Sequence, residues 1–545
     1  MKNILLFLIS LFPIITMGQN WQWAKQVGGS AQQSYDHGNV KTDGTNFYLY
    51  GTFSGVMQLQ SGTFNSNGVS DFFIIKYDNN GNEQWVKTFG GYNSSSQGEN
   101  ISALYDSVSN CIYLTGTFQG SMSLGGSNLV SNGYGRNFLA KMDLTGTVLW
   151  AKKIWTRVSS NLNDYERMGW VLQKNGIIVI YSNLLDTAYF DGLVAGPGGC
   201  LAKLDGNGTC FFTRHFYDFS APPPSYEGGF SIKYVGSDMI ILGNFKNTLW
   251  IDTAVVTSNG DYDMLLARAD SNGHIKWIKR FGYGNIDFFG DHGIDAYGNL
   301  YAVGGFGDSI SFNGNSFYSP VIDFIFMKFD SIGNLIFANQ GNSSTTIINP
   351  GQMVADNDGN TYVAGDFTGS VTFGNYSIST TNQIAAFLAR FNSNGDCLGV
   401  KHFGKADASS IVVDQMGNPV VAGGIANTVT IGNNTFTTNG PWDVYLAKCD
   451  IFTGIGGNEK TPNSQLHIYA NPNAGKCNIT IPDDLVNEKE LTLSIYDNTG
   501  KMIQQKSVAL TNGKVKVNLE AQAKGVYTVT VTNGVKFYHG KIVFE

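Results

Sequence analysis

Short segments in which apolar and polar residues alternate recur along most of this chain. Residues 85–89 read WVKTF and residues 361–367 read TYVAGDF. A period of two places successive side chains on opposite faces of a β-strand, so Trp85 and Phe89 share one face, and Lys87 is left available at the strand edge. Segments of the form D-x-x-G separate the strands, because aspartate caps a tight turn and glycine accepts a positive φ there. The pattern predicts an all-β fold.

One longer pattern of about 60 to 65 residues repeats between residues 21 and 454. Each copy contains W-x-K-x-F-G-G, then D-x-x-G-N-x-Y-x-x-G-x-F, then D-x-F-L-x-K-x-D-x-x-G-x-x-x-W. The opening position is occupied in turn by Trp23, Trp85, Trp150, Phe212, Trp277, Phe337 and Gly399. A repeat of this length with about four strands is typical of a propeller blade. The sequence therefore predicts a seven-bladed β-propeller over residues 19–454.

The order of the motifs also predicts how the ring closes. The first tryptophan strand precedes the first inner strand, and no such strand follows Lys448. We expect residues 22–27 to become the outer strand of the seventh blade, which removes an exposed sheet edge. The repeats resemble the SBBP-type seven-bladed β-propeller family, with the best copies of D-x-x-G-N-x-Y-x-x-G-x-F at Asp295–Phe306 and Asp356–Phe367. That resemblance implies a fold and an extracellular setting, but no general activity.

The chain changes character after about residue 455. A stretch rich in Gly, Asn, Pro and Ser supplies a linker at 455–463, and alternating strands follow it. Several short strands with Asn-Gly turns predict a small Ig-like β-sandwich over residues 464–545.

Four motifs in this last segment resemble the type A sorting domain of the type IX secretion system. They are LHIYANPN at 466–473, IYDNTGK at 495–501, GVYTV at 525–529 and KIV at 541–543. Ala470 stands where the family usually has proline. The resemblance implies export across the outer membrane of a Bacteroidetes-type bacterium through the type IX machinery. It also implies removal of the domain by a sortase-like peptidase, with release or attachment to the cell surface.

The other end of the chain resembles a secretory signal peptide at residues 1–18. Lys2 is followed by an apolar stretch, and small or neutral residues precede Gln19. This stretch is short for a bilayer span, and Pro13 interrupts it. No other run approaches about 18 apolar residues, so we expect no transmembrane segment in the mature chain.

Composition narrows the classes of function. The formal net charge is −7 and 14% of residues are charged, which argues against nucleic-acid binding because that needs a basic surface. Six cysteines are scattered along the chain, and the sequence leaves open whether Cys200 and Cys210 form a disulfide bridge. No Cys/His cluster predicts a metal, and Asp356–Asn360 fits the repeat's ordinary turn better than a calcium loop. No catalytic motif or cofactor motif is present.

The predicted connections from each outer strand to the next inner strand gather on one face and hold many aromatic residues. The candidate ligand-binding residues are Tyr35, His37, Tyr92, Tyr165, Arg167, Tyr217, Tyr226, Tyr283, Phe288 and His292. Aromatic rings mixed with polar groups can stack on sugars or anchor a protein. Alternatively, the rings pack locally and fix long loops. His292, a lone histidine in a predicted loop, is expected to be solvated.

A basic residue recurs in the third strand of every unit. The set is Lys76, Lys141, Lys203, Arg268, Lys328, Arg390 and Lys448. We interpret these as structural charges at a strand edge, paired with an aspartate two residues on as in Lys76-Tyr77-Asp78. A basic channel lining is the alternative.

Three functions fit this sequence. The first is a secreted or surface-attached, non-catalytic binding or adhesion propeller for a glycan or a protein. The second is an extracellular polysaccharide hydrolase or lyase, and the third is a structural surface scaffold. An enzyme should show clustered carboxylates with shifted pKa values at the channel mouth. A binding protein should show an exposed aromatic patch.

Overall fold

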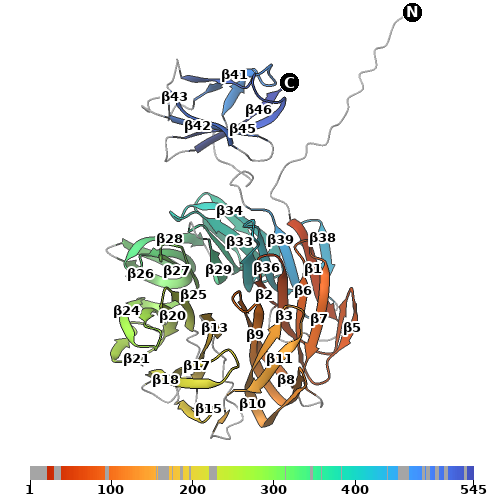
Figure 1. Ribbon diagram of the computed structural model, residues 1–545. Helices are drawn as coiled ribbons and strands as arrows, with labels where there is room; N and C mark the ends of the chain where they lie inside the picture. Colours follow the sequence, from red (N-terminus) through yellow and green to blue (C-terminus); the bar gives the residue numbers. More distant parts are fainter. Residues whose placement is uncertain are drawn as a thin grey trace, which may run out of the picture. The chain divides into compact units, whose positions relative to one another are not determined.

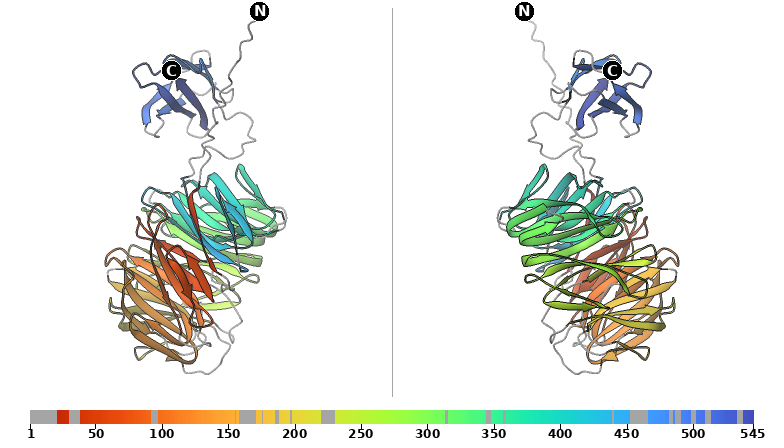
Figure 2. Two further views of the ribbon diagram at one scale, coloured as in Figure 1. Left: turned by 90° about the vertical axis from the view of Figure 1, so that its right-hand side faces the viewer. Right: turned by 90° about the vertical axis from the view of Figure 1, so that its left-hand side faces the viewer.

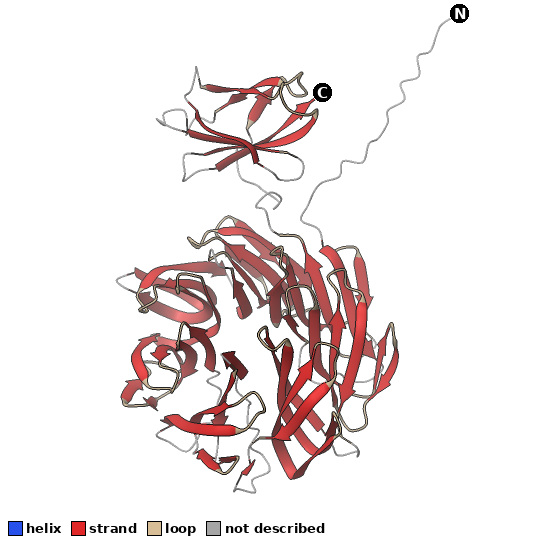
Figure 3. Cartoon of the chain, viewed as in Figure 1, coloured by secondary structure: helices blue, strands red, loops and turns tan. Residues whose placement is uncertain are grey.

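Strands are the regular elements throughout the described residues of the computed structural model (Figure 3). The chain divides into two compact units, residues 1–457 and 458–545. The predicted signal peptide and linker lie outside the described residues. No helix in the described part of the chain has the length and hydropathy that a membrane crossing requires. The structure describes residues 21–29, 38–91, 97–154, 156–157, 171–174, 176–184, 188–195, 198–219, 230–312, 315–343, 348–356, 359–381, 383–438, 440–451, 466–481, 485, 491–497, 502–508, 513–532 and 537–545.

Between Trp21 and Cys449, the described residues form seven antiparallel sheets that share one four-strand core order. We number them I to VII along the chain and give their strands from first to last. Sheets I to III contain β2 (Asn39–Thr42), β3 (Phe47–Phe53), β6 (Asp71–Tyr77) and β7 (Glu83–Phe89); β8 (Gln97–Asp106), β9 (Cys111–Leu124), β10 (Ser127–Asp143) and β11 (Val148–Lys153); and β13 (Val171–Lys174), β14 (Ile177–Leu184), β17 (Gly198–Leu204) and β18 (Cys210–Phe219).

Sheets IV to VII repeat the same order. They contain β19 (Phe230–Val235), β20 (Asp238–Phe245), β23 (Asp263–Ala269) and β24 (Ile275–Phe281); β25 (Gly284–Ile294), β26 (Leu300–Phe312), β27 (Asn315–Phe329) and β28 (Leu335–Ser343); β29 (Ile348–Ala355), β30 (Thr361–Phe367), β33 (Ala385–Phe391) and β34 (Cys397–Gly404); and β35 (Ser410–Val413), β36 (Pro419–Ile425), β39 (Asp443–Cys449) and β1 (Trp21–Gly29).

The seven sheets follow one another around a propeller-like ring, and β2, β13, β25 and β29, each the first strand of its sheet, lie toward the centre (Figure 1). Figure 2 shows neighbouring sheets of this unit packed side by side. Each pair of neighbouring sheets shares a buried apolar cluster. Phe72 of sheet I and Phe138 of sheet II, for example, belong to the same cluster. The ring is closed by β1, which pairs antiparallel with β39 from Trp21 to Val27. The first strand of the described residues therefore completes sheet VII.

A hairpin between the second and third strands of each sheet was not apparent from the sequence, which suggested only a loop there. In sheets II and V the hairpins are the extended ends of β9 and β10 and of β26 and β27. The others are β4 (Val56–Leu59) with β5 (Gly62–Asn65), β15 (Ala188–Phe190) with β16 (Leu193–Ala195), β21 (Thr248–Ile251) with β22 (Ala254–Thr257), β31 (Ser370–Phe373) with β32 (Tyr376–Ser379), and β37 (Thr428–Ile431) with β38 (Asn434–Thr437).

Three of these hairpins extend the outer edge of the preceding sheet. β4 pairs with β1, β21 with β18 and β31 with β28. β15 pairs with β12 (Thr156–Arg157), which follows the last strand of sheet II. An unpaired strand edge is a site for aggregation, and these pairings cover the edges of β1, β12, β18 and β28 where they occur.

In every sheet the recurring basic residue faces one residue of the second strand and one residue of the fourth strand, and in sheets I and II these are a tyrosine and a tryptophan. In sheet I, Tyr48 faces Lys76 across β3 and β6, and Lys76 faces Trp85 across β6 and β7. The Lys76 ammonium lies 5.5 Å from the centre of the Tyr48 ring. Three separate sequence motifs therefore build one polar and aromatic stripe.

This stripe contacts the D-x-x-G turn between the third and fourth strands of the next sheet. Trp85 Nε1 donates to Leu144 O at 3.1 Å, and Lys76 Nζ donates to the same carbonyl at 3.3 Å. The contact recurs in other pairs of sheets. Lys203 Nζ donates to Asn272 Oδ1 (2.6 Å), Arg268 Nη1 to Ser331 O (2.5 Å), Lys328 Nζ to Ser393 O (3.1 Å) and Lys448 Nζ to Asn79 Oδ1 (2.5 Å). We call this contact the turn clasp.

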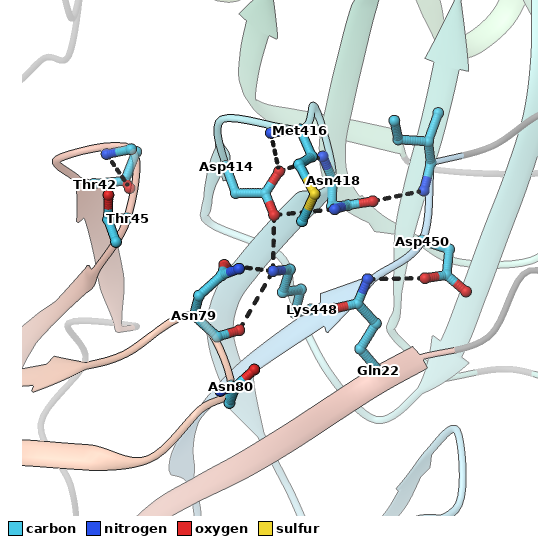
Figure 4. Close-up of polar contacts among 12 residues, drawn as sticks. Gln22, Thr42, Thr45, Asn79, Asn80, Asp414, Met416, Asn418, Lys448 and Asp450 are labelled. Atoms are coloured by element: carbon cyan, nitrogen blue, oxygen red, sulfur yellow. Dashed lines mark hydrogen bonds and ion pairs between the residues drawn. The ribbon is translucent and has the colours of Figure 1, made fainter. Parts of the chain in front are cut away.

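The clasp between sheets VII and I closes the ring (Figure 4). The Lys448 side chain is 1% exposed, and its ammonium lies 2.8 Å from Asp414 Oδ2 within sheet VII. Asn79 of sheet I accepts from it through both its side chain and its carbonyl. Trp23 Nε1 donates to that carbonyl at 3.1 Å. A buried cation thus has partners on both sides of the join.

We expected each basic residue to pair with the aspartate two residues further along the chain, and for Lys448 and Arg268 this expectation is wrong. Lys448 pairs with Asp414 and Arg268 pairs with Asp238, and neither aspartate is two residues further along the chain. Side chains two residues apart on a strand point the same way, but the chain turns just after the basic residue. Asp78, two residues after Lys76, instead caps its own turn by accepting the backbone amides of the residues that follow.

The cysteines are unpaired. All six are free, Cys200 and Cys210 included. Burial raises the pKa of the Cys200 thiol to about 12, so it packs as a small apolar residue rather than as a nucleophile.

The second unit contains two sheets packed around one apolar core that includes Leu493, Val529 and Ile542. Asn471 clamps the end of the chain: it accepts from Val543 N at 2.7 Å and donates to Lys541 O at 2.7 Å. The strands are β40 (His467–Tyr469), β41 (Lys476–Thr480) and β44 (Lys514–Asn518) in one sheet, and β43 (Met502–Val508), β42 (Leu491–Tyr496), β45 (Gly525–Thr532) and β46 (Phe537–Phe544) in the other.

Deletion of residues 20–28 should lower the melting temperature strongly. The deletion removes nearly all of β1, exposes the edge of β39 and takes away the Trp23 half of the clasp. Thermal unfolding followed by circular dichroism tests this, and an unchanged melting curve would show that closure by β1 does not stabilise the ring.

Lys448→Met should lower the free energy of unfolding by about 3 kcal/mol, because it leaves the Asp414 carboxylate buried without its cation. Urea denaturation measures the loss. Lys87→Met is the matched control, since Lys87 is an exposed lysine on β7 and should change stability by less than about 0.5 kcal/mol. Equal effects of the two substitutions would contradict a stabilising role for the clasp.

Candidate functional site at strand β25

The start of β25 brings two buried carboxylates together at the boundary of sheets IV and V. Asp287 lies on β25 and Asp263 begins β23, and both side chains are fully buried. A Cβ at Gly282 would lie 2.7 Å from Asp263 Oδ1 and 2.8 Å from Asp287 Oδ2. Both carboxylates therefore face one backbone position, where only glycine leaves enough room.

The two carboxylates have different partners. Arg280 Nη1 donates to Asp263 Oδ2 at 2.5 Å, whereas Asp287 Oδ2 accepts the backbone N–H of Tyr283 at 2.9 Å. Burial raises the pKa of the Asp287 carboxyl to about 7, and the negative charges of Asp263 and Asp308 act in the same direction. Asp287 therefore takes up a proton near neutral pH, whereas Asp263 is paired with the Arg280 guanidinium.

Asp287 fixes the short connection that carries Tyr283. Besides accepting from Tyr283 N, it donates its own N–H to Tyr262 O at 2.8 Å. Ile286 forms a parallel bridge with Tyr262. The Tyr283 side chain is 63% exposed on this anchored backbone. An exposed ring on an ordered connection can contact a partner with little loss of conformational entropy.

Further along β25, a charged cluster lies among the first strands at the centre of the ring. Asp291 Oδ1 lies 3.0 Å from Lys233 Nζ of β19, and Asp291 Oδ2 accepts Met353 N of β29 at 3.1 Å. Lys233 also donates to the carbonyl of His292. Asp291 thus holds three consecutive sheets together. Burial alone would raise the pKa of Asp291, but Lys233 and His292 hold it below the ordinary value.

Lys41 of β2 adds a second cation to this cluster. Its side chain is half-buried. Burial lowers the pKa of the Lys41 ammonium, and the charge of Asp291 opposes that shift. These groups come from sheets I, IV and V, and they partly neutralise one another.

His292 is fully buried, so the expectation of a solvated loop histidine is wrong. The connection expected to hold His292, residues 282–293, is mostly strand β25, and a bulge at Gly290 lets it approach the Pro350 carbonyl of the next sheet. Burial, together with the charge of Lys233, lowers the pKa of His292 to about 3. Both ring nitrogens lack a hydrogen-bond partner in the structure.

The structure places few of the other candidate ligand-binding residues. Tyr283 is exposed, and Phe288 is half-buried against the position of Gly305. The backbone of Tyr217 belongs to β18, but its side chain lies outside the described residues. Tyr35, His37, Tyr92, Tyr165, Arg167 and Tyr226 lie outside the described residues altogether. A common binding face for this set stays a prediction.

Sequence reasoning missed Asp263, Asp287, Asp291 and Lys233. Asp263 shares its strand position with Asp71, Asp323 and Asp443, so the repeat could have indicated a buried aspartate there. Asp287 has no such signal, because its pairing with Asp263 depends on the path of the chain at Gly282.

In the described residues, no three His, Cys, Asp or Glu side chains are arranged to hold a metal ion. At Asp356–Asn360, which we preferred to interpret as a turn, Asp356 N donates to Asn360 O at 2.9 Å. Asn360 N donates a hydrogen bond to Asp356 Oδ1 at 2.8 Å. The carboxylate is thus occupied by its own turn.

Residues 467–545 match the family model described as a secretion system C-terminal sorting domain. The protein is therefore secreted or displayed on the cell surface. The match covers the second unit, where the LHIYANPN motif contacts the terminal strand. A sorting domain implies contact with the secretion machinery. No curated protein matches the chain.

Among solved structures, the chain is similar to the Dos1 propeller at 9% identity and a TM-score of 0.38, over 79% of this chain and 95% of that one. A DUF4221 family member from Bacteroides vulgatus matches at 11% identity and 0.33, over 63% and 90%. Apocarotenoid oxygenase from Synechocystis matches at 10% and 0.34, over 76% and 94%. Likenesses this distant carry no argument about activity.

Asp287→Asn should change how stability depends on pH. The pKa of Asp287 is about 7 in the folded state against 3.8 as the ordinary value, so the folded state holds a proton that the unfolded state has lost. Raising the pH from 4 to 7 should therefore destabilise the wild-type protein relative to the variant by up to about 1.4 kcal/mol per pH unit. Above pH 7 the difference should stay constant.

Urea denaturation at several pH values measures this difference. Asp261→Asn, which removes a half-exposed carboxylate paired with Lys246, controls for the loss of a charge. A difference between wild type and Asp287→Asn that does not vary with pH would contradict the buried, protonated state of Asp287.

Proposed function

We propose that residues 19–454 form a seven-bladed β-propeller that acts outside the cell as a non-catalytic binding or adhesion module for a glycan or a protein. The sorting domain at 464–545 would direct export by the type IX system. A sortase-like peptidase would then cut within 455–465, with release or attachment to the cell surface. The repeat pattern and the resemblances described above support both parts.

The observation that carries the binding function is Tyr283. Its ring is 63% exposed, yet its backbone is fastened by Asp287 and the connection is anchored to Tyr262. A surface tyrosine that serves only to pack a loop would be covered by that loop. A fixed and exposed ring fits a contact residue, since aromatic rings supply large contact area at low entropic cost.

A polysaccharide hydrolase or lyase is the second candidate, and the raised pKa of Asp287 is the observation that favours it. The geometry argues against it, because Asp263 and Asp287 are both fully buried and a substrate oxygen must reach a general acid directly or through one water. Asp263 is also neutralised by Arg280. We therefore interpret the pair as a structural device that holds the Tyr283 connection.

Tyr283→Ala should weaken binding to whichever surface the mature chain recognises by about tenfold or more without lowering the melting temperature, because most of the residue is exposed to solvent. A polysaccharide and glycoprotein array, with product release monitored in the same wells, identifies the surface. Tyr297→Ala is the matched control: Tyr297 is 79% exposed in a turn between β25 and β26, at the other end of the strand.

Equal binding by Tyr283→Ala and wild type would remove Tyr283 from the site. Released products would overturn the non-catalytic function. The absence of binding to every surface would leave the structural scaffold as the better proposal.

A further inference from the structure

The hairpins of sheets III to VII present a row of side chains to solvent that contains no charge. Strand alternation sends one set of their residues inward, as with Val429 and Phe436, and the other set outward. We call the outward set the hairpin belt. Its members are Tyr189, Val194, Thr248, Trp250, Val255, Thr257, Ser309, Ser311, Ser316, Tyr318, Ser370, Thr372, Ser377, Ser379, Thr428, Thr430, Thr435 and Thr437.

The hydroxyl groups of the belt are ordered by one another. Cross-strand hydroxyl pairs recur on four hairpins: Thr248 with Thr257 (3.1 Å), Ser311 with Ser316 (2.8 Å), Thr372 with Ser377 (2.8 Å), Thr428 with Thr437 (3.3 Å) and Thr430 with Thr435 (3.0 Å). A hydroxyl that gives or accepts one bond keeps further capacity for a partner. The belt therefore offers fixed hydroxyl groups rather than freely rotating ones.

Aromatic and branched side chains stand in the same row on sheets III to V. Trp250 is 49% exposed and lies directly opposite Val255, and Tyr189 lies opposite Val194 in the same way. Tyr318, which is 67% exposed, faces Ser309. Indole and phenol rings at such positions offer flat apolar faces beside hydroxyl groups.

The absence of charge is unusual for exposed strands. Strands near a sheet edge are commonly protected by charged side chains, lysine above all, yet none stands in the belt. A nucleic acid, an acidic polysaccharide or a charged protein surface would be matched by opposite charges. An uncharged polysaccharide instead presents hydroxyl groups and apolar C–H faces, which are the groups that the belt complements.

We infer that the hairpin belt is the binding surface for a neutral polysaccharide, with Trp250 and Tyr318 stacking on sugar rings and the threonine and serine pairs bonding their hydroxyl groups. This inference rests on the proposed binding function and names its surface and its ligand class. The hairpins stand one per sheet around the ring, so an extended chain can contact several of them in succession.

The test is affinity electrophoresis of the mature full chain in gels that contain a neutral polymer, either starch, hydroxyethylcellulose or soluble β-1,3-glucan. Gels with alginate or polygalacturonate are the acidic counterparts. Retardation is expected in at least one neutral gel and in neither acidic gel. The double substitution Trp250→Ala and Tyr318→Ala should weaken the retardation by about tenfold or more. Tyr297→Ala should leave it unchanged.

A second variant, Thr428→Val with Thr430→Val, removes hydroxyl groups and keeps side-chain size. It should also weaken retardation while the melting temperature stays that of the wild type. This variant tests the belt even where loss of Trp250 disturbs its hairpin.

Other results would overturn the inference. Undiminished binding by both belt variants, with loss of binding in Tyr283→Ala, would place the site at the β24–β25 connection and leave the proposed function standing. Binding only to acidic polymers would reject the ligand class. Concentration-dependent self-association that both belt variants abolish would make the belt a contact between copies of the chain. The absence of binding to any polymer or glycoprotein would reject the belt and the proposed function together.

Discussion

The ring depends on one contact, in which a carbonyl or amide group of a D-x-x-G turn accepts hydrogen bonds from the tryptophan and the basic residue of the preceding sheet. Trp85 and Lys76 both donate to Leu144 O, and Trp23 and Lys448 both donate to Asn79. Apolar clusters between sheets supply most of the buried surface, but apolar packing is not directional. The polar clasp has a direction, and it orients the sheets that it joins.

The clasp also explains why certain residues of the repeat recur together. Aspartate forms the turn, glycine leaves room for the indole ring, and the lysine and tryptophan reach the turn from the neighbouring sheet. A Cβ at Gly81 would lie 2.7 Å from the Trp23 ring, and one at Gly208 would lie 2.6 Å from Trp150. Residues far apart in each repeat are thus contact partners between repeats, as expected where each unit is stabilised by its neighbours.

A ring fixed in this way leaves two parts of the chain available for recognition. The connection before β25 presents Tyr283 on a backbone that a buried carboxyl group holds. The hairpins present an uncharged row whose hydroxyl groups order one another. In both, binding groups stand on ordered β-structure, which lowers the entropic cost of association. The charged groups at the centre serve the ring instead, because Asp291 bonds three consecutive sheets.

Strand alternation, the repeat period and the turn motifs of the sequence determined the all-β class, the succession of similar four-stranded sheets and the sorting domain, since these are local patterns. Only the tertiary structure decided which residues meet: that Lys448 pairs with Asp414 rather than Asp450, that His292 is buried in a strand, and that Asp263 and Asp287 share one position beside Gly282. The hairpins also escaped prediction, because their short strands resemble loop sequence until a neighbouring sheet supplies an edge for pairing. Such contacts join residues of different repeats, and their energy depends on burial and distance, which no spacing along the chain records.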